Sequence, residues 1–248
     1  MNMTKIKNLK IIIKKNKFIY EKIKKSYKVF INIKIKLKYL FGTNKDIFTD
    51  IYLKNKWGDE HSFSGSGSNL NQTKTVLQEL PIIIRKYKIK SILDIPCGDF
   101  YWMKEIDFKD INYIGGDIVS EIVNKNLSQF KKSNVHFRLI DLLLDDLPDS
   151  ELIFCRDCLV HFSNKDIFKA LSNIRKTNAK YFMTTNFVDR VQNEDIATGS
   201  WRTINLCKPP FNFPEPILSI LEKCTEGDNL FSDKALSLWE LGQIPKYK

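Results

Sequence analysis

The sequence ILDIPCGDFYWM, residues 92–103, joins an apolar run to a turn that contains proline and glycine. A short apolar run that ends at such a turn is typical of a buried strand. We expect this strand at residues 91–95, with Asp94 near its end and a helix at residues 100–106. The rest of the chain decides what kind of sheet the strand joins.

Short β-type runs alternate with helical stretches around this segment. Strands alternating with helices predict an α/β fold in which helices cover both faces of a parallel sheet. The expected strands are residues 91–95, 112–118, 135–140, 151–155, 180–185 and 235–241. The expected helices are residues 69–87, 100–106, 119–130 and 165–176.

Three successive strands are expected to end in a carboxylate, at Asp94, Asp117 and Asp141. In parallel sheets, ligands bind beyond the carboxyl ends of the strands. An ionised carboxylate only accepts hydrogen bonds, so it can bind both hydroxyls of a ribose. The pattern therefore predicts a ligand that contains a ribose.

The loop after the first strand indicates what else that ligand contains. Pro96, Cys97, Gly98 and Asp99 include one glycine, and Pro96 has no amide donor. A pyrophosphate needs several free backbone amides and a close approach of the backbone. The loop therefore favours a nucleoside with a cationic or zwitterionic tail over a dinucleotide.

Residues 91 to about 187 resemble the class I S-adenosylmethionine-dependent methyltransferases. In ILDIPCGD, Asp94 and Gly98 match the acid and the later glycine of the family's first motif, whereas Pro96 and Phe100 stand at glycine positions. The runs YIGGDIV and RDCLVH are similar to those of a bacterial subgroup linked to surface-glycan and small-metabolite loci. The resemblance implies S-adenosylmethionine as the cofactor and a Rossmann-like, mostly parallel seven-stranded sheet with helices on both faces.

By the same resemblance, Asp117 would bind the ribose hydroxyls and Asp141 the adenine amino group. Within the polar segment SFSGSGSNLNQT, residues 62–73, residues 64–73 would close over the methionine end of the cofactor; a flexible linker is the alternative interpretation. The cofactor-binding residues that the resemblance implies are Ser66, Ser68, Thr73, Asp94, Pro96, Cys97, Gly98, Asp117, Ile118, Asp141, Leu142 and Arg156.

The cluster CRDCLVHF, residues 155–162, holds two thiols and an imidazole. A structural zinc site needs four ligands in a tetrahedral array, and Cys155, Cys158 and His161 supply three. No second C-x-x-C pair exists in the sequence, and a redox pair would open a helix in a different topology. We therefore expect no metal.

The resemblance places this cluster next to the transferable methyl group. His161 is the candidate general base, because its unperturbed pKa of ~6.5 lets it accept a proton near neutral pH. Packing or capping of a helix is the structural alternative for His161. Asp157, the second catalytic candidate, would orient the substrate or cap a helix. Arg156 would bind an anionic group of the substrate or pair with Asp157.

The segment TGSWRTINLCKPPFNFPEP, residues 198–216, follows the fifth expected strand, where this fold inserts substrate-binding elements. Trp201 would stack on a polar substrate and Arg202 would pair with it; a packed surface loop is the alternative. The run KPPF, residues 208–211, is similar to the turn of amino-methylating nucleic-acid enzymes. It has Lys208 where those enzymes have Asp or Asn, and it follows a different strand. We therefore do not take it as evidence for a nucleic-acid methyltransferase.

Positive charge is concentrated in the first part of the chain. Residues 1–58 hold sixteen lysines and three carboxylates, whereas residues 59–248 hold twenty-four basic and twenty-six acidic residues. We interpret residues 1–58 as a lysine-rich helical extension and residues 59–248 as the methyltransferase domain. The extension would be a nucleic-acid arm, a membrane-surface patch or solvated lysines beside an apolar stripe. We expect no nucleic-acid partner and at most weak contact with an anionic membrane.

Together these patterns predict an S-adenosylmethionine-dependent methyltransferase that acts on a small polar molecule. The favoured reaction is O-methylation of a sugar, a nucleotide sugar or a phosphorylated metabolite, because the domain is nearly neutral. The alternatives are a nucleic-acid methyltransferase that uses the extension, and a non-catalytic cofactor-binding or membrane-tethered scaffold. Five cysteines without a disulfide spacing indicate a reducing cytoplasm, at the inner face of the membrane if the extension binds lipid.

Overall fold

The computed structural model describes residue 26 and residues 42–130 and 132–247. Contacts divide the chain into two units, Met1–Phe41 and Gly42–Lys248, and the second unit carries the fold. The helix predicted within residues 1–58 lies mostly outside the described residues. No helix in the described part of the chain has the length and apolar character that a membrane crossing requires.

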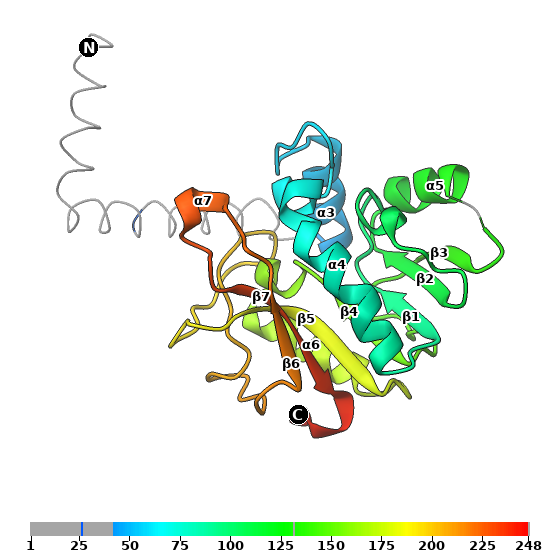
Figure 1. Cartoon of the computed structure of the whole chain (residues 1–248). Coiled ribbons are helices and arrows are strands. Elements are labelled where there is room, and N and C mark those ends of the chain that lie inside the picture. The colour runs from blue at the N-terminus through cyan, green and yellow to red at the C-terminus, as the bar shows by residue number, and fades with distance from the viewer. Residues whose placement is uncertain (1–25, 27–41, 131, 248) are drawn as a thin grey trace, which may run out of the picture. The chain divides into compact units, whose positions relative to one another are not determined.

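A seven-stranded sheet forms the centre of the described domain (Figure 1). Its strands lie in the order β3-β2-β1-β4-β5-β7-β6. The strands are β1 (Ser91–Asp94), β2 (Asn112–Asp117), β3 (Val135–Leu139), β4 (Leu152–Cys155), β5 (Tyr181–Phe187), β6 (Leu218–Leu221) and β7 (Lys234–Glu240).

The prediction of a mostly parallel sheet is wrong, because the sheet is mixed. β1 to β5 pair in parallel, whereas β7 runs antiparallel to β5 and β6 runs antiparallel to β7. A parallel neighbour needs a long crossover, usually a helix. Residues 222–233 join β6 to β7 and hold one helix of four residues, Glu226–Asn229, which is too short to form the usual crossover along the sheet. The sequence pattern revealed β7 and missed the four-residue edge strand β6.

Side chains cap the starts of the helices at residues 44–53, 70–86 and 164–174, whereas those at residues 120–129 and 226–229 have no side-chain cap. Asn69 accepts a hydrogen bond from the Gln72 amide at the start of α4, and Ser163 accepts one from the Asp166 amide at the start of α6. The helix predicted at residues 100–106 is instead a turn followed by one 3-10 turn, Met103–Glu105. The helices are α3 (Asn44–Leu53), α4 (Leu70–Lys86), α5 (Ser120–Gln129), α6 (Asn164–Ile174) and α7 (Glu226–Asn229).

Each face of the sheet has its own apolar core. Successive residues of a strand point to opposite faces, so Ile92 and Leu93 of β1 enter different clusters. Ile92 packs in a cluster with Leu80 of α4 and Val123 of α5. Leu93 packs in the cluster that contains Leu171 of α6. Helices therefore cover both faces, as a Rossmann-like α/β fold requires (Figure 1).

The helix α3 packs with the sheet domain although it lies within the residues interpreted as an extension. Thr43 and Asp46 form a reciprocal capping box at its start. Ile47 and Ile51 are buried, and the Phe48 ring lies 5.7 Å from the Phe162 ring. Because Phe162 follows β4, α3 reaches the end of the sheet where the strands present their carboxyl ends.

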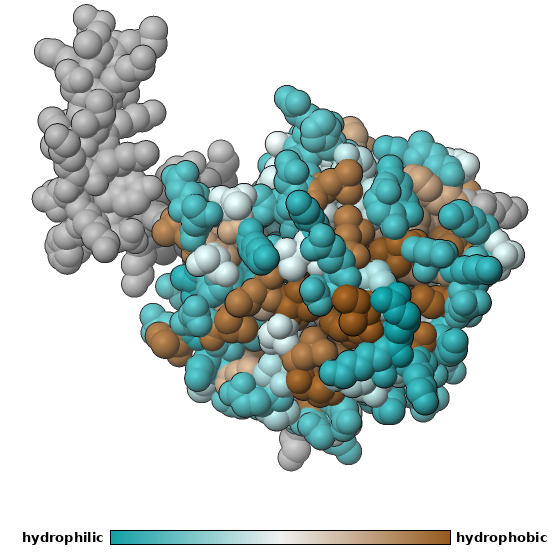
Figure 2. Space-filling model, viewed as in Figure 1, coloured by the Kyte–Doolittle hydropathy of each residue, from teal (hydrophilic) through white to brown (hydrophobic). Residues whose placement is uncertain are grey.

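The surface in Figure 2 is mostly hydrophilic, with apolar residues gathered across its middle, over α4 and β6. Ile82 of α4 is 49% exposed and Leu221 of β6 is 51% exposed. Among the described strands, β6 pairs with β7 alone, so it forms one edge of the sheet. A strand of four residues offers little length for pairing with another chain.

Candidate active site

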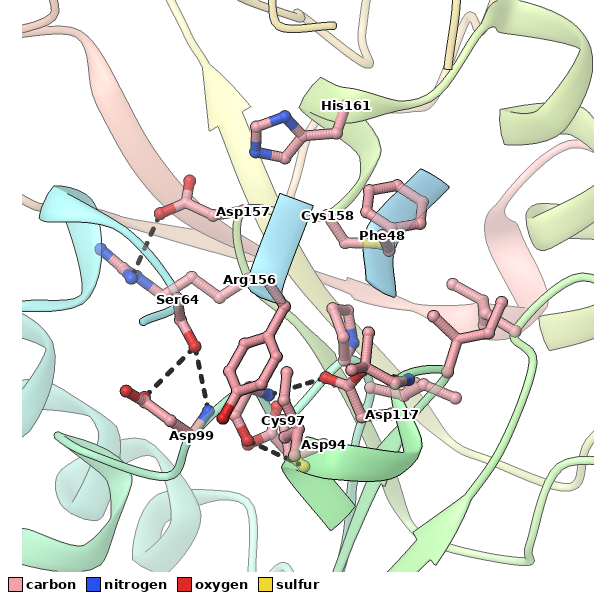
Figure 3. A pocket seen from close by; sticks show the side chains of 18 of the residues that line it. Phe48, Ser64, Asp94, Cys97, Asp99, Asp117, Arg156, Asp157, Cys158 and His161 are labelled. Carbon is pink, nitrogen blue, oxygen red and sulfur yellow. Dashed lines mark hydrogen bonds and ion pairs between the residues drawn. The ribbon is translucent and has the colours of Figure 1, made fainter. Parts of the chain in front are cut away.

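Two adjoining cavities lie beyond the carboxyl ends of β1, β2 and β4. They share four lining residues, Trp57, Ser64, Asp157 and His161. Figure 3 shows Asp94 and Asp117 at one end of the first cavity and Asp157 and His161 at the other. The predicted site residues that line the first cavity are Ser68, Asp94, Pro96, Cys97, Gly98, Asp117, Ile118, Asp141, Leu142, Arg156, Asp157 and His161.

The loop after β1 can hold only glycine at residue 98. Gly98 has φ +54°, in the region that L side chains rarely adopt, and a Cβ there would lie 2.2 Å from Ser64 Oγ. Its amide donates a hydrogen bond to Asp117, N to Oδ2 at 3.1 Å. The loop therefore links the ends of β1 and β2 and brings their carboxylates into one cavity.

The segment of residues 62–68 is docked on this loop by Asp99, which the sequence pattern placed in the loop but not among the candidate site residues. Ser62 and Ser64 donate hydrogen bonds to Asp99 Oδ1 at 3.1 and 3.2 Å, and the Phe63 amide donates to Oδ2 at 2.8 Å. The Asp99 amide in turn donates to Ser64 Oγ. These bonds fix one end of the segment over the first cavity.

Of the three predicted residues in and after this segment, Ser68 lines the first cavity and Ser66 the second. Thr73 reaches neither cavity, because it is buried in α4 and its hydroxyl donates to the Asn69 carbonyl at 2.8 Å. Phe48 and Tyr52 of α3 also line the first cavity. The sequence signal that could have revealed the start of α3 is Thr43 followed three residues later by Asp46, the pattern of a capping box.

Asp94 and Asp117 are buried carboxylates. Burial raises the pKa of Asp94 to about 8, although the Tyr113 hydroxyl donates to its Oδ2 at 2.5 Å. Burial also raises the pKa of Asp117 to about 6, although the Val119 and Gly98 amides donate to it. Water therefore compensates little of the charge on either group's ionised form, and both groups take up a proton more readily than an exposed carboxyl group.

Asp141 completes the row of carboxylates on the first cavity. It is partly exposed, and partial burial raises its pKa. Its Oδ1 accepts a hydrogen bond from the Leu143 amide at 2.9 Å. The three strand-end aspartates thus line one cavity from three neighbouring strands, in the order β3-β2-β1.

His161 is held in one orientation at the junction of the two cavities. Its ring stacks on Trp57 with centroids 4.7 Å apart, and its Nδ1 lies 2.8 Å from the Ser200 carbonyl oxygen. Burial lowers the pKa of His161, so the ring is neutral at pH 7. A neutral ring that donates from Nδ1 carries its lone pair on Nε2, which has no hydrogen-bond partner within residues 42–130 and 132–247.

A buried ion cluster borders both cavities. Arg156 binds Glu222 at 2.6 Å and Asp157 at 3.2 Å, and Lys234 binds Asp157 at 2.7 Å and lies 3.6 Å from Glu222. Arg156 also donates to the Gly67 carbonyl at 2.8 Å. The cluster contains two cations and two carboxylates, so it is neutral as a whole.

Asp157 is the least buried residue of this cluster, with its side chain 24% exposed. Burial alone would raise its pKa, but Lys234 and Arg156 outweigh burial and hold the pKa at about 2. Its backbone has φ +52°, a strained conformation for a residue with a side chain. The Thr185 hydroxyl stabilises it by accepting from the Asp157 amide at 2.7 Å. Asp157 therefore stays ionised and cannot serve as a base near neutral pH.

The two predicted substrate residues after β5 lie in different surroundings. Trp201 lines the second cavity and is 41% exposed. Arg202 is 1% exposed and lines neither cavity; it donates to the carbonyl oxygens of Glu194 and Leu159 and to the side chain of Asn164. Burial lowers the pKa of Arg202 to about 10. Its contacts fix the loop that carries Trp201.

The two thiols of the cluster at residues 155–162 are buried in the core of the sheet. Cys155 is 0% exposed and Cys158 is 6% exposed, and both pack with apolar side chains of the α6 face. The described residues contain no group of three or more His, Cys, Asp or Glu side chains placed to hold a metal ion.

Replacing Glu222 with alanine should lower the free energy of unfolding by about 3–5 kcal/mol, because it leaves Arg156 and Lys234 sharing one carboxylate in a buried site. Urea denaturation followed by circular dichroism measures the change. The control is Lys169→Ala, which removes an exposed partner 3.6 Å from Asp166 and should change stability by under about 0.5 kcal/mol. Equal effects of the two substitutions would contradict the role assigned to the ion cluster.

No protein-family model matches the sequence, and no curated protein matches it. Among solved structures, PigF with bound SAH has a TM-score of 0.56 at 16% identity, over 83% of this chain and 65% of that one. Magnesium protoporphyrin IX methyltransferase (ChlM) from Synechocystis PCC 6803 with bound SAH has a TM-score of 0.45 at 14% identity, over 58% and 72% of the two chains. The N-methyltransferase NodS from Bradyrhizobium japonicum WM9 has a TM-score of 0.45 at 13% identity, over 55% and 72%.

At these identities a structural likeness shows the fold alone. Of the three structures, PigF has the TM-score that supports a shared fold. This chain spans 65% of the length of PigF. The likeness to PigF therefore supports a Rossmann-like α/β fold for this chain.

Proposed function

We propose that the protein is an S-adenosylmethionine-dependent methyltransferase that methylates a hydroxyl of a small polar molecule, in the class of sugars, nucleotide sugars and phosphorylated metabolites. One observation carries the proposal. A cavity with the buried carboxylates Asp94 and Asp117 opens beside a neutral His161 into a second cavity. The fold shared with PigF, which binds SAH, supports the same cofactor.

The carboxyl groups that line the first cavity suit this cofactor. Asp117 and Asp141 offer acceptor oxygens at the ends of neighbouring strands, where hydroxyl and amino groups of an adenosine can donate to them. Burial disfavours the ionised forms of Asp94 and Asp117 and so raises their pKa values; a positively charged ligand beside them would stabilise these ionised forms and displace the protons. Bound S-adenosylmethionine supplies a methyl group that a sulfonium activates for displacement.

The residues at the junction of the two cavities then act on the methyl acceptor. Nε2 of His161 accepts the proton of the acceptor hydroxyl as the oxygen forms its bond to the methyl carbon. The Ser200 carbonyl holds the proton on Nδ1, which keeps Nε2 available. Asp157 stays ionised and fixed by Lys234, so its role is to position and not to accept the proton.

The nearly neutral charge of residues 59–248 supports a small-molecule acceptor over a nucleic acid. A nucleic-acid site needs a positively charged surface along the substrate. The second cavity is lined by aromatic side chains and by the carboxylates of Asp157 and Glu226. The acceptor is identified by mass spectrometry, as the mass increment of one methylene across a panel of sugars, nucleotide sugars and phosphorylated metabolites.

Calorimetry of the full-length protein with S-adenosylmethionine tests the cofactor. We expect binding that tightens as the pH rises from about 6 to about 8, because Asp117 and Asp94 have pKa values of about 6 and about 8 in the ligand-free protein. The cationic ligand favours the ionised carboxylates, so binding releases protons, and affinity falls as the pH drops through these values. Titrations in two buffers of different ionisation enthalpy count the protons. An absence of binding, or affinity that rises as the pH falls, would contradict the proposal.

A further inference from the structure

The second cavity lies where an acceptor would have to bind, so its chemistry restricts what the acceptor is. Trp57, Asp157 and His161 belong to both cavities, and a molecule in the second cavity faces the first across them. The remaining lining comes from the segment of residues 64–67 and from residues after β5 and β6.

This cavity offers no free positive charge to an anion. Among the described residues that line it, Lys234 is the one cation, and Asp157 and Glu222 already neutralise it at 2.7 and 3.6 Å. Arg156, the other cation of the cluster, is likewise paired with Glu222 and Asp157. A phosphate bound here would have to break one of these buried pairs, which is costly.

A carboxylate outside the cluster gives the cavity a negative charge. Glu226 lines it and accepts a hydrogen bond from the Ser66 hydroxyl. A Cβ on Gly67 would lie 3.2 Å from Asp157 Oδ2, 3.4 Å from Lys234 Nζ and 3.5 Å from Glu226 Oε2, so two carboxylates and one ammonium gather at this side of the cavity. With Lys234 neutralised, Glu226 sets the charge of the site.

Aromatic rings also line this cavity. Trp201 and Phe231 meet edge to face with centroids 4.9 Å apart, and Phe187 lies 6.2 Å from Trp201. Trp57 adds a fourth ring where the two cavities meet. Aromatic faces next to a carboxylate attract an organic cation, because the ring quadrupole and the carboxylate both favour positive charge.

We propose that the acceptor is a hydroxylated amine, of the class of amino sugars and amino alcohols, whose protonated amine binds beside Glu226 while a hydroxyl faces His161. The proposal rests on the proposed function and narrows its acceptor class, because it excludes nucleotide sugars and phosphorylated metabolites. The transferred methyl forms a bond to the hydroxyl oxygen, its bond to sulfur breaks with the electron pair kept by sulfur, and the hydroxyl proton passes to Nε2 of His161.

Binding of three matched probes tests the proposal: glucosamine, glucose and phosphorylated glucose. The full-length protein is saturated with SAH, and quenching of tryptophan fluorescence reports the second cavity, which Trp57 and Trp201 line. We expect glucosamine to bind about tenfold more tightly than glucose, corresponding to about 1.4 kcal/mol, and phosphorylated glucose to bind most weakly. Glucosamine that does not bind, or binds no more tightly than either other probe, would overturn the proposal.

A pair of variants separates local recognition from overall charge. Glu226→Gln should abolish the preference for glucosamine over glucose. Asp228→Asn changes the net charge equally in the same short helix, at an exposed residue outside both cavities, and should keep the preference. Equal behaviour of the two variants would refute recognition by Glu226. SAH binding is measured in the same samples, so a protein that binds SAH without preferring the amine fails this inference alone. A protein that does not bind SAH fails the proposed function.

Discussion

Replacing His161 with glutamine should lower kcat about 100- to 10,000-fold, the range expected for the loss of a general base. Glutamine keeps a polar side chain but cannot accept a proton near neutral pH. The dissociation constant of the cofactor should stay nearly unchanged, because the carboxylates that bind it lie at the other end of the first cavity (Figure 3). Steady-state kinetics on the acceptor found by mass spectrometry and calorimetry with SAH measure the two effects separately.

The pH profile distinguishes a base from a residue that only packs. Burial lowers the pKa of His161 below its ordinary value, so the neutral, proton-accepting form persists to lower pH. Wild-type kcat should be level above about 6.5 and should fall as the pH drops through the lowered pKa. The His161→Gln variant should lose this fall. Trp57→Phe keeps an aromatic ring stacked on residue 161 and serves as the control; if it lost as much activity as His161→Gln, the stacking and not the imidazole would be responsible.

Replacing Asp117 with asparagine should weaken cofactor binding about 100-fold. Hydrogen bonds to a charged group contribute about 1.5–3 kcal/mol each, and asparagine replaces a charged acceptor by a neutral amide. The loss should be accompanied by the disappearance of the proton release assigned to a pKa of about 6. Calorimetry with S-adenosylmethionine at several pH values measures both.

The thermal stability of ligand-free Asp117→Asn tells whether weaker cofactor binding merely reflects unfolding of the variant. The raised pKa of Asp117 means that its ionised form opposes folding above pH 6, but asparagine can accept only one of the two backbone hydrogen bonds that Asp117 takes from Gly98 and Val119. The two effects offset each other, so Asp117→Asn should unfold within about 4 °C of the wild type. Asp141→Asn is the matched control, because Asp141 lines the same cavity but is less buried; it should weaken binding much less. Equal losses for the two variants would contradict the dominant role of Asp117.

Local sequence patterns predicted the half of the sheet that holds the first cavity. The apolar runs before Asp94, Asp117 and Asp141 correspond to β1, β2 and β3, and the loop glycine Gly98 stands where no other residue fits. These features depend on neighbours within a few residues, so the chain displays them directly. The helix predicted after Gly98 failed because Phe100 has φ +58°, a turn conformation that periodicity does not reveal.

The second cavity could not be predicted in the same way. Arg156 and Glu222 are 66 residues apart, and Asp157 and Lys234 are 77 residues apart. Nothing near Glu222 or Lys234 in the sequence distinguishes them from ordinary charges at strand ends. Their partners are set by the strand order, in which β7 lies between β5 and β6. The prediction of a mostly parallel sheet could not yield that arrangement.

The reversed direction of β7 has a consequence for how this fold can acquire new specificity. Lys234 opens β7 and pairs in register with Phe187, the last residue of β5. A parallel strand would have delivered Lys234 to the far rim, roughly 20 Å away at about 3.3 Å per residue over its seven residues. The antiparallel direction of β7 thus brings residues 224–231 to the second cavity, so substitutions there can change what that cavity recognises without altering β1, β2 and β3.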